Sequence, residues 1–590
     1  MISCKNDFSK MFRFCLKIMV KKSKFKMILW IILNIITSLT PSLLIILNRN
    51  IINYIKEKES YEMIILLLLL VGFLQIIIAL LSLYTNYIYE IIKKDIDYYI
   101  YRRLYEKLTI TPLERFEDNE YFNTVTMAQR AVQMNGVYNI KYIIDIFKAF
   151  ITMLSVVMVL LIIHWSLPIA LIISMVPGFV GTIIAKSIDY KNNVDLLPSE
   201  RMQSYISSLF FNKNFLKEAK IFKLRDYLLT KWSEIFKNIK NAKIKILAKE
   251  SKITFIGNNV IQISTVIVNI YLVYNIFSSK ITLGDYVALT EAIVVLQSEL
   301  GNIAMNVGEL FEIGLYNKSL MTIINEDSVA TFNNEDMLEK IQTLELKNIS
   351  FKYPNNKKTV LNNISLKINK GEKIAIVGYN GSGKSTLINI ILGIYTNIEG
   401  DYELNGIKVD KSTINKYQSR MTMIFQDFIR YKLSIRENVA FGNIQNISND
   451  ELIKDSLREV GLEENIEKLP CSINTILSKE FTNGTELSGG EWQKLAMARS
   501  LIKDSDVVIF DEPTSALDPI AELEVSDLLN NTCKDKTTIM ISHRLGITKF
   551  ADRIIVMKEG KIIERGSHKE LIKKNGEYKK LYESQAEFYR

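Results

Sequence analysis

The chain has 590 residues, 48% of them hydrophobic and 23% charged, a length that predicts roughly three or four domains and an apolar content that excludes a mainly disordered chain. Four cysteines with no Cys-x-x-Cys pair and no even spacing exclude a disulfide-stapled secreted scaffold and a zinc ribbon. The formal net charge of +10 has two possible explanations, a nucleic-acid partner or the charge bias of a membrane protein, and the second is considered first.

Apolar residues gather in long runs before about residue 305, and these runs predict six membrane-spanning helices. A helix needs about 20 apolar residues to cross the hydrocarbon of a bilayer. The run Ile64–Leu70, followed by Phe73–Leu81, is too long and too evenly apolar for a helix of a soluble core. In chain order the predicted spans are Met27–Leu47, Met63–Tyr84, Tyr142–Ile163, Leu167–Ala185, Ile253–Ile276 and Leu283–Ile303.

The distribution of lysines predicts the orientation of these spans. The 26 residues before the first span carry eight basic side chains opposed only by Asp7, and the segment between the fourth and fifth spans is also rich in lysine. Positive charge is retained on the cytoplasmic side, so both regions are expected inside the cell. Segment 1–26 is expected to form an interfacial helix rather than a secretory signal. The positive charge is then largely a topology signal, and no nucleic-acid partner is expected.

Two inner segments, about 88–141 and 187–251, are far longer than the outer loops and have apolar residues at helical spacing. Helices that continue into the cytosol imply a contact there, near Leu113–Glu117 and Leu209–Lys223. The predicted membrane domain therefore covers residues 27–320, and residues 321–340 form a linker. From residue 341 to 590, short apolar runs separated by turns indicate a soluble α/β domain.

The first motif of that domain is a glycine-rich loop. Lys373–Val377 is a predicted strand, Leu387–Leu392 a predicted helix, and the residues between them contain Gly-x-x-x-x-Gly-Lys-Ser, which in this context binds nucleotide phosphates. Lys384 is expected to reach the β- and γ-phosphates, and the Ser385 hydroxyl to ligate Mg²⁺. ATP and Mg²⁺ are the expected cofactors. The loop, called the phosphate loop below, consists of Gly378, Tyr379, Asn380, Gly381, Ser382, Gly383, Lys384, Ser385 and Thr386.

Two further strands end in candidate catalytic residues. The apolar run Val507–Phe510 leads to Asp511 and Glu512, and a buried parallel strand would bring both carboxylates to the edge where the phosphates lie. Asp511 is expected to hold Mg²⁺ through water, and Glu512 to orient or deprotonate the water that attacks the γ-phosphate. His543 follows a second apolar strand and is expected to hydrogen-bond the γ-phosphate.

A short motif, Leu487-Ser488-Gly489-Gly490-Glu491, precedes a predicted helix and offers another anion site at a helix N-terminus. Taken with the phosphate loop, Gln426, the two carboxylates, Asp518 and His543 in this order, it resembles the ATP-binding cassette of ABC transporters. The six-span region resembles the membrane domain of ABC exporters. The resemblance thus covers nearly the whole chain and implies an ATP hydrolase coupled to transport.

The resemblance also implies residue roles. Tyr353 matches the aromatic residue that stacks on adenine, and Gln426 matches the glutamine that touches Mg²⁺ and the attacking water. The motif Leu487–Glu491 matches the signature that closes over the nucleotide of the other cassette, and Asp518 matches the residue that communicates across that interface. The catalytic residues implied are Glu512, His543 and Gln426.

One cassette and six spans are half of what the family uses, so the resemblance implies a homodimer in the lipid bilayer. Each ATP would lie between Lys384 of one copy and Ser488 of the other. The inner stretches near Leu113–Glu117 and Leu209–Lys223 would correspond to the helices that rest on the cassettes. The expected location is the bacterial cytoplasmic membrane, with the cassette and the N-terminus in the cytoplasm.

The cargo is predicted from finer resemblances. The stretches Ile424–Phe428, Lys217–Phe222 and Leu487–Lys494 are similar to those of bacterial exporters of lantibiotics and related peptides, which makes a peptide the expected cargo. A multidrug or lipid exporter of the same architecture is the alternative, and a nucleotide-gated channel or regulatory subunit is a further one. Glu291 and Glu299 of the sixth span are hypothesised to meet a cationic peptide, the alternatives being interhelical hydrogen bonding or an outer vestibule.

Overall fold

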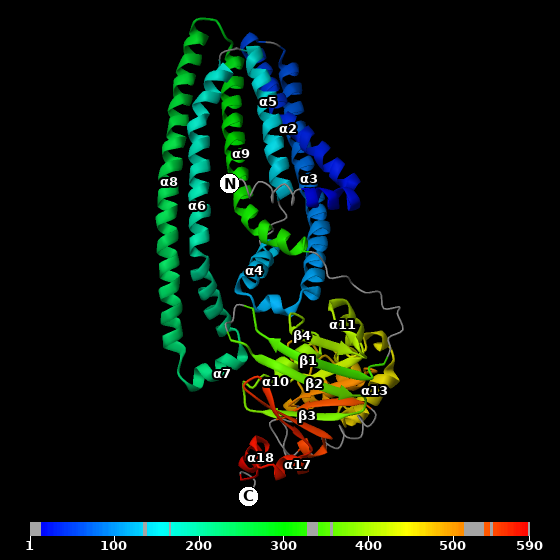
Figure 1. The fold of residues 1–590 in the computed structure, drawn as a ribbon. Coiled ribbons are helices and arrows are strands. Elements are labelled where there is room, and N and C mark those ends of the chain that lie inside the picture. The colour runs from blue at the N-terminus through cyan, green and yellow to red at the C-terminus, as the bar shows by residue number, and fades with distance from the viewer. Residues whose placement is uncertain are drawn as a thin grey trace. The chain divides into compact units, whose positions relative to one another are not determined.

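The computed structural model describes residues 13–58, 60–133, 139–163, 167–326, 340–354, 358–512, 536–542 and 547–587. Its internal contacts divide the chain into two units. The first comprises Met1–Thr109 with Asn123–Glu326, and the second comprises Ile110–Phe122 with Asp327–Arg590. Helices make up the first unit, whereas two sheets form the centre of the second (Figure 1). The short segment Ile110–Phe122 groups with the sheets, which the contiguous boundaries drawn from the sequence do not anticipate.

The first unit consists of long helices. Five of the described helices contain a stretch long and apolar enough to cross a membrane, and these stretches coincide with five predicted spans. The remaining predicted span, Leu167–Ala185, is helical within α6. The helices are α2 (Lys24–Glu57), α3 (Tyr61–Ile110), α4 (Asn119–Gln133), α5 (Asn139–Ile163), α6 (Leu167–Phe210), α7 (Lys213–Ile221), α8 (Arg225–Phe277) and α9 (Leu283–Ile324), and residues 13–22 are also helical.

Helices α3 and α8 extend well beyond a bilayer, as the sequence predicts. They contain 50 and 53 residues, which at 1.5 Å per residue gives lengths of roughly 75–80 Å, more than twice the hydrocarbon thickness. Helices α6 and α8 lie side by side (Figure 1). A Cβ atom on Gly257 of α8 would lie 3.0 Å from the Cα of Gly178 in α6, so these two helices approach as closely as only small residues permit.

Polar contacts join α2 to the beginning of α9. A capping box of Thr282 and Asp285 starts α9, and the Nε of Arg49 donates to Asp285 Oδ1 at 2.6 Å. The Oδ1 of Asn53 accepts from the backbone N–H of Gly284 at 2.9 Å. A Cβ at residue 284 would lie 2.3 Å from the carbonyl oxygen of Arg49, so glycine is required for this contact. These bonds fix the register of α2 against α9.

The second unit has an antiparallel sheet, ordered β2-β1-β4-β5, and a larger sheet, ordered β10-β9-β3-β8-β7-β6. In the larger sheet β9, β3, β8, β7 and β6 are parallel, and every residue of β7 and β8 is buried, as expected for apolar runs covered on both faces. The strands are β1 (Thr343–Phe351), β2 (Leu361–Asn369), β3 (Lys373–Gly378), β4 (Glu399–Leu404), β5 (Ile407–Lys408), β6 (Met421–Ile424), β7 (Val507–Asp511), β8 (Thr537–Ile541), β9 (Arg553–Lys558) and β10 (Lys561–Gly566).

Helices pack on both sheets and close two apolar cores. The α-helices are α10 (Lys384–Ile391), α11 (Lys411–Gln418), α12 (Ile435–Ala440), α13 (Asp450–Glu459), α14 (Glu463–Glu467), α15 (Gly489–Leu501), α17 (His568–Lys573) and α18 (Glu577–Glu587). The short 3-10 helices are η1 (Leu113–Glu117), η3 (Ile444–Asn446), η4 (Ser472–Asn474) and η5 (Ile547–Phe550).

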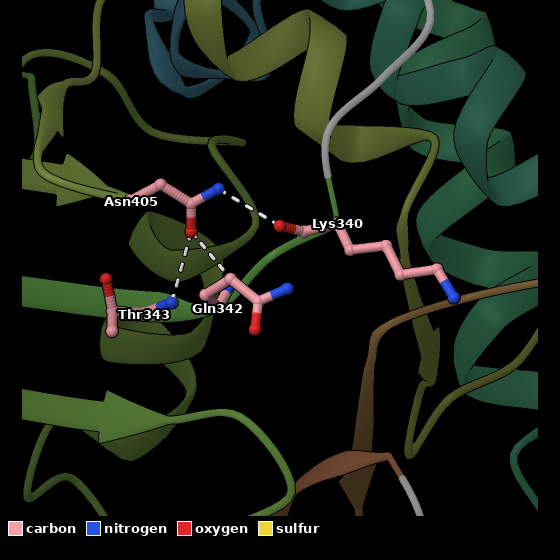
Figure 2. A pocket seen from close by; sticks show the side chains of 4 residues that line it. All are labelled: Lys340, Gln342, Thr343 and Asn405. Carbon is pink, nitrogen blue, oxygen red and sulfur yellow. Dashed lines mark hydrogen bonds between the residues drawn. The ribbon is translucent and has the colours of Figure 1, made fainter.

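The side chain of Asn405, in the turn between β4 and β5, forms hydrogen bonds with the backbone at the start of β1 (Figure 2). Its Oδ1 accepts from the backbone N–H groups of Gln342 and Thr343 at 2.7 and 3.1 Å, and its Nδ2 donates to the carbonyl of Lys340 at 3.0 Å. The residue has a φ of 54°, a left-handed conformation that asparagine tolerates better than most residues. One side chain therefore fixes the backbone at the start of β1.

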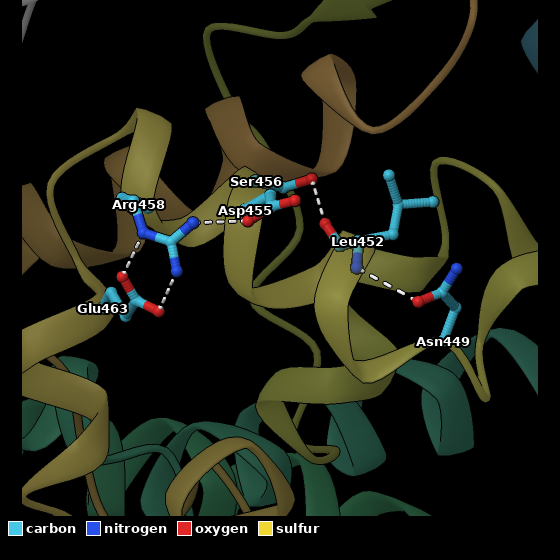
Figure 3. A network of polar contacts seen from close by, with 6 residues as sticks. All are labelled: Asn449, Leu452, Asp455, Ser456, Arg458 and Glu463. Atoms are coloured by element: carbon cyan, nitrogen blue, oxygen red, sulfur yellow. Dashed lines mark hydrogen bonds and ion pairs between the residues drawn. The ribbon is translucent and has the colours of Figure 1, made fainter.

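The turn between α13 and α14 is held by charge (Figure 3). The guanidinium of Arg458 donates two bonds to Glu463, both of 2.7 Å, and a third to Asp455. Asn449 caps α13 by accepting from the backbone N–H of Leu452 at 3.2 Å. A bidentate pair of this kind sets an angle as well as a distance, so α14 is held in a defined position relative to α13.

Candidate functional site

The phosphate loop has the backbone that a tight turn around an anion requires. Gly381 and Gly383 have φ values of 76° and 99°, and α10 begins directly afterwards at Lys384. Gly378 has a φ of 154°, and a Cβ there would lie 2.2 Å from the carbonyl oxygen of Met557. Such glycines let successive backbone N–H groups converge on one point at a helix N-terminus.

Two side chains of this loop have polar atoms suited to phosphate. Lys384 is only 6% exposed, and its Nζ donates to the carbonyls of Gly378 and Tyr379 at 2.9 and 3.1 Å. Burial lowers the pKa of this lysine, while Glu512 and Asp511 act in the opposite direction. The Ser382 hydroxyl is buried without a hydrogen-bond partner among the described residues. A buried ammonium and an unpartnered hydroxyl form a donor set that fits phosphate oxygens.

The two carboxylates at the end of β7 lie on the side of the sheet where the phosphate loop begins. Strand β8 lies between β7 and β3, and all three are parallel, so β7 ends with Asp511 at the same edge of the sheet from which the phosphate loop departs. Asp511 is 7% exposed, and burial followed by the adjacent Glu512 raises its pKa to about 6. A buried carboxylate in this state suits a cation, because a positive charge beside it would restore the ionised form.

Glu512 adopts an unusual backbone conformation and is held by Gln426. Its φ of 49° is left-handed, which for a residue with a side chain stores on the order of 1–3 kcal/mol of strain. Its N–H donates to the carbonyl of Ile541 at 3.0 Å. The Nε2 of Gln426, two residues after β6, donates to Glu512 Oε2 at 3.0 Å. The structure thus brings together Gln426 and Glu512, which are 86 residues apart in the sequence.

An arginine that the sequence analysis does not identify binds the segment that follows Gln426. Arg499 of α15 donates through Nε to the carbonyl of Asn438 at 2.9 Å and through a second nitrogen to Asn438 Oδ1 at 2.9 Å. Its guanidinium also lies over the ring of Tyr431, 4.8 Å from the centroid. Arg499 therefore joins α15, which begins at the Ser488 motif, to the chain that follows Gln426.

Tyr353 lies beside the phosphate loop. Its hydroxyl is 3.0 Å from Thr386 Oγ1, and its ring meets that of Tyr395 edge-on at a centroid distance of 5.5 Å. Tyr395 in turn stacks on Phe351 at 5.2 Å and is 4% exposed. Burial raises the pKa of Tyr395 above its usual range, so the phenol stays neutral. The sequence points to Tyr353, but nothing in the sequence pattern indicates Tyr395.

Tyr395 is followed by two residues that bind the segment grouped with this unit. Oε1 of Glu114 in η1 accepts from the backbone N–H of Thr396 at 2.5 Å and from that of Asn397 at 3.1 Å. The predicted inner stretch Leu113–Glu117 therefore contacts the α/β fold directly beside the aromatic cluster of Tyr353 and Tyr395. The other predicted stretch, Leu209–Lys223, lies in the first unit and contains α7.

Ser488 and Glu491 form a reciprocal capping box at the start of α15. The Ser488 hydroxyl accepts from the N–H of Glu491 at 3.3 Å, and Glu491 Oε2 accepts from the N–H and hydroxyl of Ser488 at 2.9 and 2.8 Å. The bond from the Ser488 backbone is the main cause that lowers the pKa of Glu491. Asn465 of α14 also donates to Glu491, at 3.3 Å. The carboxylate thus shapes the turn, while Ser488 and Gly489 are exposed.

Other predicted residues differ in how the structure places them. Asp518 and His543 lie outside the described residues, so their positions stay predictions. Glu291 accepts from the Nδ2 of Asn48 at 3.0 and 3.1 Å, which is the interhelical bonding given as the alternative to a peptide contact. Glu299 accepts from Asn302 on its own helix at 3.3 Å.

Comparison with known proteins matches both units. The family described as ABC transporter matches residues 361–515. The subtilin transport ATP-binding protein SpaT of Bacillus subtilis is 30% identical over 94% of this chain and 90% of its own length. The nisin transport ATP-binding protein NisT of Lactococcus lactis subsp. lactis is 28% identical over 97% of this chain and 95% of its own length. An ATP-dependent lipid A-core flippase of Haemophilus influenzae (strain 86-028NP) is 27% identical over 98% of each chain.

Among solved structures, a bacterial Atm1-family ABC exporter with ATP bound has the same fold. Its TM-score is 0.79 at 20% identity, and the match covers 95% of this chain and 98% of that one. The predicted fold class, an exporter-type helical membrane domain joined to an α/β nucleotide-binding domain, is confirmed.

Proposed function

Because this chain belongs to the ABC transporter family and has the exporter fold, we propose that it uses ATP to export a peptide of the lantibiotic type. The observation that carries this proposal is the alignment with the subtilin and nisin transport proteins over 94% and 97% of the chain, which includes the membrane helices. The lipid A-core flippase, at 27% identity, makes a lipid the alternative cargo.

In the proposed reaction the phosphate loop positions the γ-phosphate and Glu512 activates water. Lys384 would exchange its two loop carbonyls for phosphate oxygens, since the charged partners form stronger bonds. Gln426 holds Glu512 where it can orient or deprotonate the attacking water. Ser385, Gln426 and Asp511 would hold Mg²⁺, which neutralises charge on the phosphates when bound. His543 is proposed to hydrogen-bond the γ-phosphate.

The working unit is proposed to be a homodimer, in which ATP lies between Lys384 of one copy and Ser488 of its partner. Support comes from the exposed Ser488 and Gly489 at the start of a helix of 13 residues, a surface able to bind an anion presented by another subunit. Tyr353 would stack on adenine, and Asp518 would communicate across the interface. ATP binding would draw the cassettes together, and hydrolysis would release them.

Movement of the cassette would reach the membrane helices partly through Glu114. One carboxylate oxygen accepts hydrogen bonds from two adjacent backbone N–H groups, so η1 would follow the backbone after Tyr395. The lysine bias near the first span places the cassette and N-terminus in the cytoplasm under this proposal, with the exporter in the bacterial cytoplasmic membrane. The boundaries 27–320 for the membrane domain and 341–590 for the cassette are retained as working limits.

Transport into inverted vesicles tests the cargo. Vesicles containing the wild-type chain should take up a cationic lantibiotic-type peptide in an ATP-dependent manner, and those containing Glu512→Gln should not. Uptake of hydrophobic dyes or flipping of labelled lipid without peptide uptake would favour the multidrug or lipid alternative. If ATP were a ligand of a channel or regulatory subunit, solute would still move through the Glu512→Gln protein, which would refute ATP-driven export.

A further inference from the structure

A polar cavity lies between α2, α3 and α5 in the first unit. Its volume is ≈ 100 Å³, and each side chain that lines it carries a polar atom. One water takes up about 30 Å³ in the liquid, so the space is sufficient for a group the size of a phosphate. Polar groups inside a membrane-spanning bundle are costly and usually mark a functional site. The cavity is separate from the nucleotide site, which belongs to the other unit.

The charge of the cavity favours an anion. Lys141, Asp145 and Lys148 line it from one face of α5, at spacings of four and three residues. Their formal sum is one positive charge. Both lysines attract Asp145 electrostatically, but among the described residues neither has a carboxylate within ion-pair distance. The lysines therefore have hydrogen-bond capacity to offer a ligand. Because Asp145 offsets one of the two positive charges, a ligand with a single negative charge would neutralise the cavity.

Two aromatic rings, those of Trp30 and Tyr89, also line the cavity. Trp30 of α2 stacks on Tyr89 of α3 with a centroid distance of 5.5 Å, and Lys141 Nζ lies 5.1 Å from the Tyr89 ring centroid. Trp30 and Tyr89 are both buried, with exposed fractions of 2% and 8%. The stacked rings give the cavity a packed aromatic wall.

The depth of the cavity corresponds to the headgroup region of a bilayer. Trp30 is four residues from Lys26, which is about 6 Å along a helix, and tryptophan and tyrosine concentrate at this level of a membrane. Asn34 and Thr37, both buried, extend the lining about 6–10 Å deeper along α2. The cavity therefore lies near the lysine-rich end of α2, where lipid phosphates meet the hydrocarbon.

We propose that this cavity binds the phosphodiester of an anionic phospholipid from the leaflet at the lysine-rich end, with Lys141 and Lys148 as its charge partners. The single net positive charge matches a phosphodiester better than a dianionic phosphate monoester. The exposed Asn86 at the cavity adds an amide suited to phosphate or glycerol oxygens. The lipid is a bound component of the exporter in this proposal, separate from the cargo.

Native mass spectrometry of the full-length protein tests the proposal. In micelles with equal amounts of phosphatidylglycerol and phosphatidylcholine, the wild type should retain phosphatidylglycerol preferentially, without ATP or peptide. Lys141→Gln and Lys148→Gln should each weaken that retention about fivefold, and Lys148→Arg should preserve it. Asp145→Asn should shift the preference toward phosphatidic acid. Unchanged thermal unfolding of each variant confirms that the fold is intact.

A matched control separates this site from general surface charge. Lys26 lies at the same end of the bundle, 3.6 Å from Asp95 and outside the cavity lining, so Lys26→Gln should leave retention within about twofold. Equal retention of both lipids, or an equal loss in Lys26→Gln, would overturn the proposal. Displacement of the lipid by soluble glycerol phosphate at equal concentration would identify a free-anion site and overturn the lipid assignment. No peptide is involved, so the outcome is independent of the cargo.

Discussion

Removal of the Glu114 carboxylate tests whether η1 transmits movement between the cassette and the membrane helices. One oxygen of this side chain accepts from two consecutive backbone N–H groups, those of Thr396 and Asn397, at 2.5 and 3.1 Å. These N–H groups follow Tyr395, which packs against Tyr353. Among the described residues, Glu114 is the only acceptor that η1 provides for these two N–H groups, and substitution by alanine removes it.

The expected loss is set by the strength of these two bonds. A hydrogen bond to a charged group contributes about 1.5–3 kcal/mol when buried, and the half-buried position of Glu114 lowers the sum for both to about 2–3 kcal/mol. That is about 30- to 150-fold in the equilibrium between docked and undocked η1. Glu114→Gln keeps an uncharged acceptor and should lose about 1–1.5 kcal/mol, or about 5- to 13-fold.

Coupled transport and ATP turnover should respond differently to this change. In reconstituted vesicles, Glu114→Ala should hydrolyse ATP within about twofold of the wild type while cargo moved per ATP falls at least tenfold, with Glu114→Gln between the two. Glu117, an exposed carboxylate in the same 3-10 helix, provides the matched control, and Glu117→Ala should transport normally. Wild-type coupling in Glu114→Ala would refute this reasoning, as would an equal loss in Glu117→Ala.

Three further predictions concern the cassette. Gln426→Ala, which removes the amide donor to Glu512 Oε2, should lower kcat for ATP about 10- to 100-fold with little change in KM. A change confined to KM would place Gln426 in binding instead. Glu491 has a lowered pKa in the folded state, so its stabilising effect is present above pH 4.5 and is lost as pH falls through the folded value. The stability measured by thermal unfolding should therefore change less between pH 7 and pH 4 in Glu491→Gln than in the wild type. The difference should be under about 1 kcal/mol, because this cap is partly exposed. The same pH dependence in both proteins would argue against this role. Gly378→Ala should abolish binding of a fluorescent ATP analogue, because a Cβ would lie 2.2 Å from the Met557 carbonyl; normal binding would show that the loop can shift.

Much of the nucleotide site could be predicted because its signals are local. Gly378–Thr386 follows an apolar strand and precedes a helix, so spacing alone identifies the phosphate loop. Asp511 and Glu512 end a run that is apolar throughout, which is typical of a strand buried on both faces. The order of strands in the sheet then brings these segments together, as in other folds of parallel strands.

Other parts of the site depend on contacts between distant segments and leave no local pattern. Tyr395 belongs to no motif in the sequence, and only its packing on Phe351 and Tyr353 places it beside the nucleotide site. Arg499 can hydrogen-bond the backbone of Asn438 because α15 lies next to that residue, which is 61 residues earlier in the chain. Glu291 has the sequence context of a membrane carboxylate, but its role as partner of Asn48 is visible only when α2 and α9 are packed together.

The amino-acid sequence by itself determined the helical and α/β division, the predicted spans and the phosphate-binding chemistry. These follow from hydrophobic periodicity and from motifs whose atoms are neighbours in the chain, and neither needs long-range information. Only the tertiary structure decided that Glu114 binds the backbone after Tyr395, and that Lys141 and Lys148 share a cavity with Trp30. Each of these contacts joins side chains from separate elements, whose distances are set by the packing of whole helices and sheets.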